Sequence, residues 1–164
     1  MKRFIVLLIL MSYLVYGFAG NPELIVKLKV KKEIKIIDRK FNINKVFDNR
    51  PDSFKNVGFI EGLGRFRTYL NFEDSLSVIT KNYLEIALPK RDSMIAVKMQ
   101  INKISCRNKQ NFNYVAAIVY MEIEFYSMDN KLLFDINLTK ERQKLRITQR
   151  TYADLIQLIF EDSF

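Results

Sequence analysis

The sequence predicts an α+β fold, with a largely antiparallel sheet and two helices packed on one face. Several segments alternate apolar and polar residues with a period of two, which is typical of half-buried strands. Two other segments repeat apolar residues with the period of a helix, one before Pro89 and one at the end of the chain. The order is strands, a helix, three strands and a closing helix, which favours helices segregated on the sheet.

The first nineteen residues form a segment of their own. Lys2 and Arg3 precede an apolar run, residues 4–15, and the small residues Gly17 and Ala19 close it. Charge, then apolar residues, then small residues is the order of a bacterial secretory signal peptide. The run is also shorter than the roughly 20 apolar residues that span a membrane.

We therefore expect a signal peptide at residues 1–19, cleaved near Ala19, and a single α+β domain over residues 20–164. The protein would then be periplasmic or secreted, and the alternative is an uncleaved segment that anchors it. Lipid attachment after the apolar run is excluded, because it needs a cysteine at that point and the only cysteine is Cys106.

The segment 24–37 is expected to begin the sheet as a half-buried strand. Its two alternating sets are apolar and basic, namely Val26, Leu28, Val30, Ile34 and Ile36 against Lys27, Lys29, Lys31 and Lys35. The alternation resumes at Phe41 and Ile43 with shifted parity, which indicates a break near Asp38. Residues 48–52 are turn formers and end this region.

A helix is predicted between Asp74, which can cap its first turn, and Pro89, which follows its end. Its apolar stripe consists of Leu76, Ile79, Tyr83, Ile86 and Ala87. A second helix closes the chain, with Thr151 as its cap and Asp154 three residues later. Its apolar side consists of Tyr152, Leu155, Ile156, Ile159 and Phe160.

Three strands are predicted between the helices. The first covers residues 95–101 and the second residues 114–126. The inner face of the second strand consists of Val115, Ala117, Val119, Met121, Ile123 and Phe125. A tight turn at residues 129–130 leads into the third strand, residues 132–138, so the last two strands form a hairpin.

The chain is basic, with a formal net charge of +9 that becomes +7 once Lys2 and Arg3 are removed. An exported protein does not meet cytosolic nucleic acid, so nucleic acid is excluded as a partner. We expect the charge to attract an envelope protein or an anionic envelope surface, and it is compatible with peripheral membrane contact.

Two groups of residues are candidates for binding this partner. Asp48, Arg50 and Asp52 lie in one turn, where Arg50 can act as a fork donor to an anion and local ion pairing is the alternative. The second group alternates along the chain and consists of Lys140, Arg142, Lys144 and Arg146. In the preceding strand, residues 132–138, the positions of the same parity hold core residues. We therefore expect the strand to leave the sheet, or to turn this face into solvent, near Thr139. Simple solvation and protection of an edge strand are the alternative role.

The composition removes most catalytic chemistry. Histidine is absent and there is one cysteine, so Ser-His-Asp and Cys-His systems and zinc sites built on histidine or thiolates are excluded. We expect no enzyme activity, no cofactor and no metal site. Glu122 and Glu124 face the same way on one strand, and we favour a solvated face over a cation site there. Cys106 is interpreted as a small buried residue.

The stretch from Lys45 to Ala87 combines Asp48-Asn49-Arg50-Pro51-Asp52, Asn56-Val57-Gly58, Gly62-Leu63-Gly64 and a helix with spaced leucines. In these features it resembles the small envelope proteins of the YajG type, which are related to auxiliary lipoproteins of ABC-type transport systems. The resemblance implies an α+β periplasmic domain with a non-catalytic role in assembly or transport. The chain departs from that family in lacking a cysteine after its apolar run.

The leading hypothesis is an exported, non-catalytic envelope accessory protein that binds a protein or an anionic envelope component and supports transport or assembly. A small-ligand or lipid carrier is one alternative, since thirteen Phe and eight Tyr can line an apolar cavity. A carboxylate-based hydrolase is another, with either Asp48 and Asp52 or Glu122 and Glu124 as its acid pair.

Overall fold

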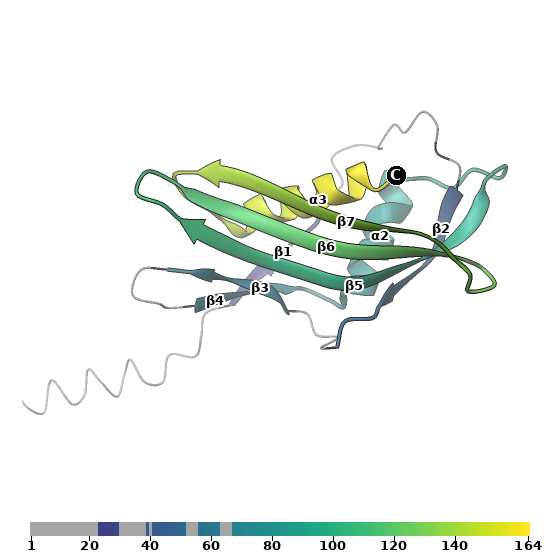
Figure 1. Ribbon diagram of the computed structural model, residues 1–164, viewed down its shortest axis with the longest axis horizontal. Helices are drawn as coiled ribbons and strands as arrows, with labels where there is room; N and C mark the ends of the chain where they lie inside the picture. The colour runs from purple at the N-terminus through teal and green to yellow at the C-terminus, as the bar shows by residue number, and fades with distance from the viewer. Residues whose placement is uncertain (1–22, 30–38, 40, 52–55, 63–66) are drawn as a thin grey trace, which may run out of the picture.

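A computed structural model of the chain describes residues 23–29, 39, 41–51, 56–62 and 67–164. These residues form an α+β fold in which one mixed sheet is combined with two helices (Figure 1). The strands are β1 (Glu23–Val26), β2 (Phe41–Asp48), β3 (Asn56–Glu61), β4 (Arg67–Phe72), β5 (Ile95–Gln110), β6 (Val115–Ser127) and β7 (Leu132–Lys144). The helices are α2 (Leu76–Ala87) and α3 (Gln149–Asp162). The signal-peptide prediction for residues 1–19 lies outside the described residues.

Strand β5 is the spine of the sheet, because its 16 residues are long enough to pair with two shorter strands in succession. The strand order is β1-β4-β3-β5-β6-β7, and β2 also pairs with β5. Along one edge of β5, β2 matches residues 95–101 and β3 meets the strand at Cys106. The opposite edge of β5 is paired with β6 from Val97 to Gln110.

The prediction of a largely antiparallel sheet is wrong, because the sheet is mixed. The pairs β3–β4, β5–β6 and β6–β7 are antiparallel, whereas β1–β4, β2–β5 and β3–β5 are parallel. The connection from β3 to its parallel partner β5 passes through β4 and α2, which supply the length that a parallel crossover needs. The pattern of local hydrophobicity carries no information on these long-range pairings.

Gly58 allows β3 to approach β5. Its φ is +143°, a conformation that residues with a side chain rarely adopt. A Cβ atom at this position would lie 1.9 Å from the carbonyl oxygen of Cys106. Cys106 is buried inside β5, not at a strand end, and burial raises the pKa of its thiol. Glycine is therefore required where the two backbones meet.

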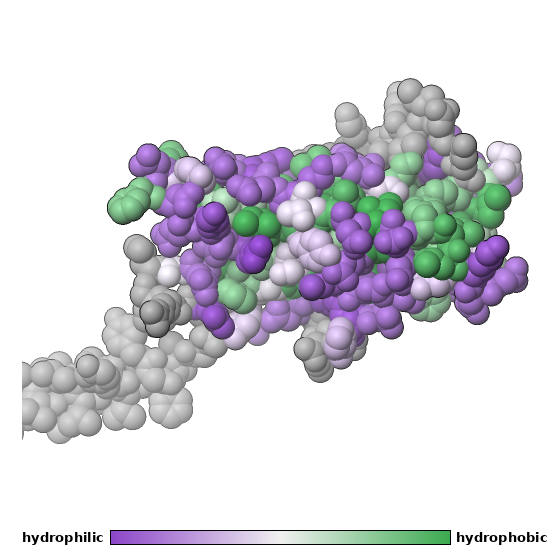
Figure 2. All heavy atoms as spheres, in the orientation of Figure 1, coloured by the Kyte–Doolittle hydropathy of each residue, from purple (hydrophilic) through white to green (hydrophobic). Residues whose placement is uncertain are grey.

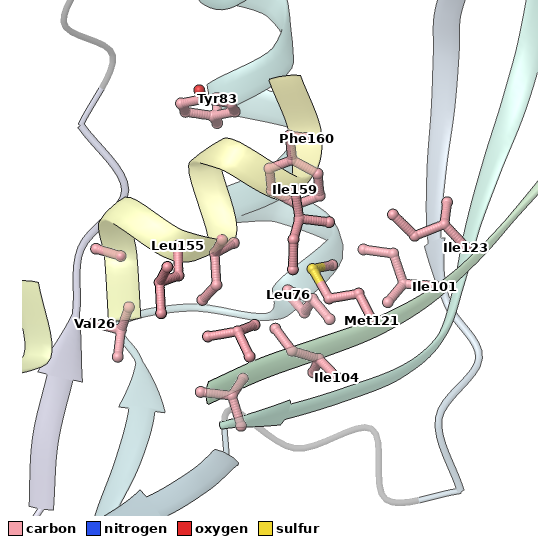
Figure 3. Close-up of a cluster of buried hydrophobic side chains, with 14 of the residues drawn as sticks. Val26, Leu76, Tyr83, Ile101, Ile104, Met121, Ile123, Leu155, Ile159 and Phe160 are labelled. Carbon is pink, nitrogen blue, oxygen red and sulfur yellow. The ribbon is translucent and has the colours of Figure 1, made fainter. Parts of the chain in front are cut away.

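The core is one cluster that joins apolar residues of β5 and β6 to apolar residues of both helices (Figure 3). The apolar residues predicted for the closing helix are all buried at 1% exposure or less. The same holds for the predicted inner face of β6 from Ala117 to Phe125, whereas Val115 is half-buried. A cluster of aromatic rings joins β2, β6, β7 and the segment after α3, through Phe41, Phe125, Phe134 and Phe164.

The β6–β7 hairpin is confirmed, with Asn130 at a φ of 66° in its turn. Helix α2 also forms, but its predicted stripe is partly wrong, since Ile86 is 63% exposed and Thr80 and Leu84 are buried instead. Helix α3 begins two residues before Thr151, with Thr148 as its N-cap. Its first turn is closed where the Thr148 N–H donates to Thr151 Oγ1 at 3.4 Å.

The predicted strand at residues 24–37 is shorter than expected within the described residues. Strand β1 ends at Val26. The alternation continues past its end, because Leu28 packs against the core whereas Lys27 and Lys29 are exposed. Residues 30–38 lie outside the described part of the chain. In contrast, β7 does not leave the sheet near Thr139, because it continues to Lys144 with unchanged parity.

Candidate functional site

Asp48 and Arg50 form a nearly buried ion pair at the end of β2. Both side chains are 7% exposed. Arg50 Nε and Nη2 donate to the two carboxylate oxygens of Asp48, each at 2.8 Å, and Nη1 donates to the carbonyl oxygen of Asn56 at 2.7 Å. The guanidinium fork therefore ties the end of β2 to the start of β3.

This arrangement gives Arg50 a structural role. Its guanidinium fork is occupied by Asp48. The structure therefore has the local ion pair that the sequence analysis gave as the alternative to anion binding. Asn56 completes the junction, because its side-chain oxygen accepts from the Gly58 N–H at 2.7 Å. Asp52, the third residue of this group, lies outside the described residues.

Lys140 and Arg142 face α3 because β7 keeps its parity past Leu138. Lys140 pairs with Asp162 at the end of the helix, and Arg142 Nη1 lies 3.3 Å from an oxygen of Asp154. These partners explain how two cations can stay on the core-facing side of the strand. Lys144 and Arg146 continue beyond them and are exposed.

A groove lies between the chain that follows β1 and the first half of α3. We call it the α3 groove; it has a volume of about 560 Å³ and is lined mainly by Ile25, Lys27, Lys29, Arg150, Asp154 and Gln157. Gln157 fixes its two walls, since its amide nitrogen donates to the Lys29 carbonyl oxygen at 2.7 Å. A smaller hollow of about 250 Å³ adjoins the groove and shares Lys29, Asp154 and Gln157 with it.

The two basic rows of the sequence, one within residues 24–37 and the other at residues 140–146, each contribute a cation to the smaller hollow. Lys29 comes from the first row and Arg142 from the second. Arg150, Asp154 and Gln157 were missed as candidate site residues. Their spacing of four and then three places them on one helical face, so a polar stripe on the closing helix was the available signal.

The outer side of β6 carries two tyrosine–glutamate pairs. Tyr120 donates to Glu122 at 2.5 Å, and Tyr126 donates to Glu124 at 2.7 Å. Hydrogen bonds, the largest effect from Asn102 and the next from Tyr126, lower the pKa of Glu124. Within the described ranges, no three Cys, Asp or Glu side chains gather as a metal ion would require.

Comparison with known proteins identifies no family. No protein-family model matches the chain, and no curated protein matches it. A solved structure titled "Crystal structure of uncharacterized protein" aligns over 88% of this chain and 94% of its own, with 9% identity and a TM-score of 0.45. A similarity at this level carries no functional information. In the part of the chain that the structure describes, neither helix is long and apolar enough to cross a membrane.

The Asp48–Arg50 pair yields a prediction about stability. Replacing Arg50 with methionine leaves the buried carboxylate of Asp48 without its partner, which should lower the free energy of unfolding by about 3 kcal/mol. Asp48→Asn combined with Arg50→Met should recover part of this loss. Urea unfolding of the single and double variants measures both effects.

The matched control is Arg67→Met. Arg67 pairs with Glu61 at 3.3 Å, but both side chains are about half exposed, so the loss should stay below about 1 kcal/mol. Equal losses for the Arg50 and Arg67 variants would contradict the structural role of Arg50.

A second prediction concerns the acid side of the stability profile. Since the pKa of Glu124 is lower in the folded chain than its ordinary value of 4.5, ionised Glu124 stabilises the fold above that value. The contribution is lost as the pH falls through the folded pKa. Glu124→Gln should therefore make the acid-side fall in Tm shallower, as measured by thermal unfolding at a series of pH values. Glu85→Gln on exposed α2 surface is the control, and an unchanged slope in Glu124→Gln would refute the assignment.

Proposed function

We propose that the chain is an exported, non-catalytic envelope accessory protein that binds an anionic component in the α3 groove. The observation that carries the proposal is the lining of this groove. Three cations, Lys27, Lys29 and Arg150, line it with one carboxylate, Asp154. Since Arg142 also lies 3.3 Å from Asp154, the cations outnumber the carboxylate at this surface.

Lys29 and Arg150 are the residues best suited to hold the ligand. Both are exposed, and within the described residues neither engages a carboxylate. An incoming phosphate or carboxylate would gain charge-assisted hydrogen bonds from both. Lys27 is paired with Glu73 at 3.2 Å, but both side chains are more than half exposed, so this pair yields readily to a stronger anion.

The groove also has an apolar part. Ile25 is 38% exposed on one wall, and Ala153 lies on the other wall. Cations beside an apolar strip favour a ligand that combines an anionic head with a short apolar portion. This describes an amphiphilic envelope component better than it describes a free inorganic ion.

The proposal takes α2 and α3 to cover the same face of the sheet, with the tyrosine–glutamate pairs on the opposite face. It is supported by the single core cluster that joins residues of both helices to β5 and β6. It also includes export through the predicted signal peptide and the non-catalytic role that the YajG-type resemblance implies.

The alternatives receive less support from the described residues. A hydrolase acid at Glu124 would need a raised pKa, whereas hydrogen bonds lower it. A carrier would enclose its ligand, but the α3 groove and its neighbour are surface hollows, and the inner sheet face is filled by side chains.

The test is calorimetric titration with dodecyl phosphate below its micelle concentration. Lys29→Gln and Arg150→Gln should each weaken binding on the order of tenfold, because each removes one charge-assisted contact. Lys131 is an exposed lysine at the β6–β7 turn, and Lys131→Gln should bind dodecyl phosphate as the unmodified chain does.

Dodecyltrimethylammonium has the same tail and the opposite charge. Binding of both amphiphiles with equal affinity, or no binding of dodecyl phosphate, would refute the proposal.

A further inference from the structure

One end of the molecule is built from two segments that lie side by side. These are residues 107–114, which end β5 and turn into β6, and residues 142–150, which end β7 and begin α3. The register places Val115 opposite both Gln110 and Lys144, so both connections project from the same end of the sheet (Figure 1). We call these two segments the basic end.

Charge at the basic end has a single sign. Its cations are Arg107, Lys109, Arg142, Lys144, Arg146 and Arg150, and neither segment contains an acidic residue. Arg142 is neutralised by Asp154, whereas Arg107, Lys109, Lys144 and Arg146 are exposed. Helix α3 also begins here, and the N-terminus of its dipole adds to the positive potential.

The basic end also carries the two most exposed large apolar side chains of the described chain. Phe112 is 108% exposed at the tip of the β5–β6 turn, and Leu145 is 89% exposed just after β7. The surface view shows this end as mainly hydrophilic, with small apolar groups projecting from it (Figure 2). This pattern differs from the centre of a typical protein interface, which is well packed and depleted of charged residues.

We propose that the basic end docks on a bilayer surface that contains anionic lipid. Phe112 and Leu145 enter the boundary between headgroups and acyl chains, while the surrounding lysines and arginines contact lipid phosphates. An apolar side chain gains from burial at that depth, and its long cationic neighbours keep their charges at the surface. Burial of two apolar side chains alone gives only weak binding, so firm docking also needs the electrostatic attraction that anionic lipid supplies.

This inference goes beyond the proposed function, because the α3 groove can hold an anion without any bilayer. Arg150 belongs to both surfaces, so a docked molecule would place the groove beside the headgroups. The two claims can fail separately, and the experiment keeps their readouts apart.

The experiment uses the absence of tryptophan from the chain. Phe112→Trp introduces one fluorophore at the tip, in protein recovered from a host that exports it. Vesicles of phosphatidylcholine with phosphatidylglycerol should shift its emission to the blue, and brominated lipid should quench it. Vesicles of phosphatidylcholine alone should do neither. Ile86→Trp, on an exposed part of α2, should show no shift with either vesicle.

Vesicle flotation then separates the two contributions. Combined Lys109→Gln, Lys144→Gln and Arg146→Gln should weaken binding on the order of fivefold for each cation removed. Phe112→Ser with Leu145→Ser should weaken binding to the same anionic vesicles at least tenfold and leave binding of dodecyl phosphate in the groove unchanged. Combined Lys45→Gln, Lys90→Gln and Lys131→Gln, which removes three exposed cations away from the basic end, is the matched charge control and should bind normally.

Three results would overturn the inference: no blue shift with anionic vesicles, equal binding to neutral and anionic vesicles, or unchanged binding by the Phe112 and Leu145 double variant. Retained binding of dodecyl phosphate in any of these cases would leave the proposed function standing. Loss of dodecyl phosphate binding with normal vesicle binding would refute the proposed function and leave the inference about the basic end standing.

Discussion

The packing of α3 against the sheet is the interaction on which the rest of the structure depends. Its apolar side places Tyr152, Leu155, Ile156, Ile159 and Phe160 in the core at 1% exposure or less. Each of the leucine, isoleucine and phenylalanine side chains contributes about 1.5–3 kcal/mol by leaving water. The Phe160 ring also contacts the Tyr83 ring of α2, with centroids 5.7 Å apart, so the two helices share one core. Figure 3 shows Leu76 of α2 and Ile159 of α3 close to Met121 of β6.

The polar side of the same helix then organises the charge of the molecule. Asp154 and Asp162 neutralise Arg142 and Lys140, which lets β7 stay in the sheet over 13 residues. Gln157 holds the chain that follows β1 by its backbone. Because these acids are used inside the fold, Lys29 and Arg150 in the α3 groove and four cations of the basic end stay exposed. One helix thus sets both the core and the two surfaces to which we assign binding.

Sequence periodicity predicted the elements whose burial is decided locally. The alternation in β6, the turn at Asn130 and the apolar side of α3 were all recognisable, because each depends on residues within a few positions of one another. Ile86 shows the limit, since its place on a helical stripe does not reveal whether a neighbour covers it.

Contacts between distant segments were not predictable in this way. Nothing near Gly58 in the sequence indicates that Cys106 lies opposite, 48 positions further along. The cationic residues after Leu138 were recognised as a row, but the acidic partners of Lys140 and Arg142 lie on a later helix, so the sequence around the strand did not reveal them. Arg50 was recognised as a fork donor, but the identity of its acceptor depends on the fold around it.

The central claim is that an anion binds in the α3 groove, beside Lys29 and Arg150. Backbone amide NMR during a titration with dodecyl phosphate tests it most directly. The account predicts that saturable shifts concentrate at Lys27, Lys29 and the first two turns of α3, around Arg150 and Asp154. Shifts centred instead on the outer side of β6, between Tyr120 and Tyr126, or no saturable shifts at all, would contradict it.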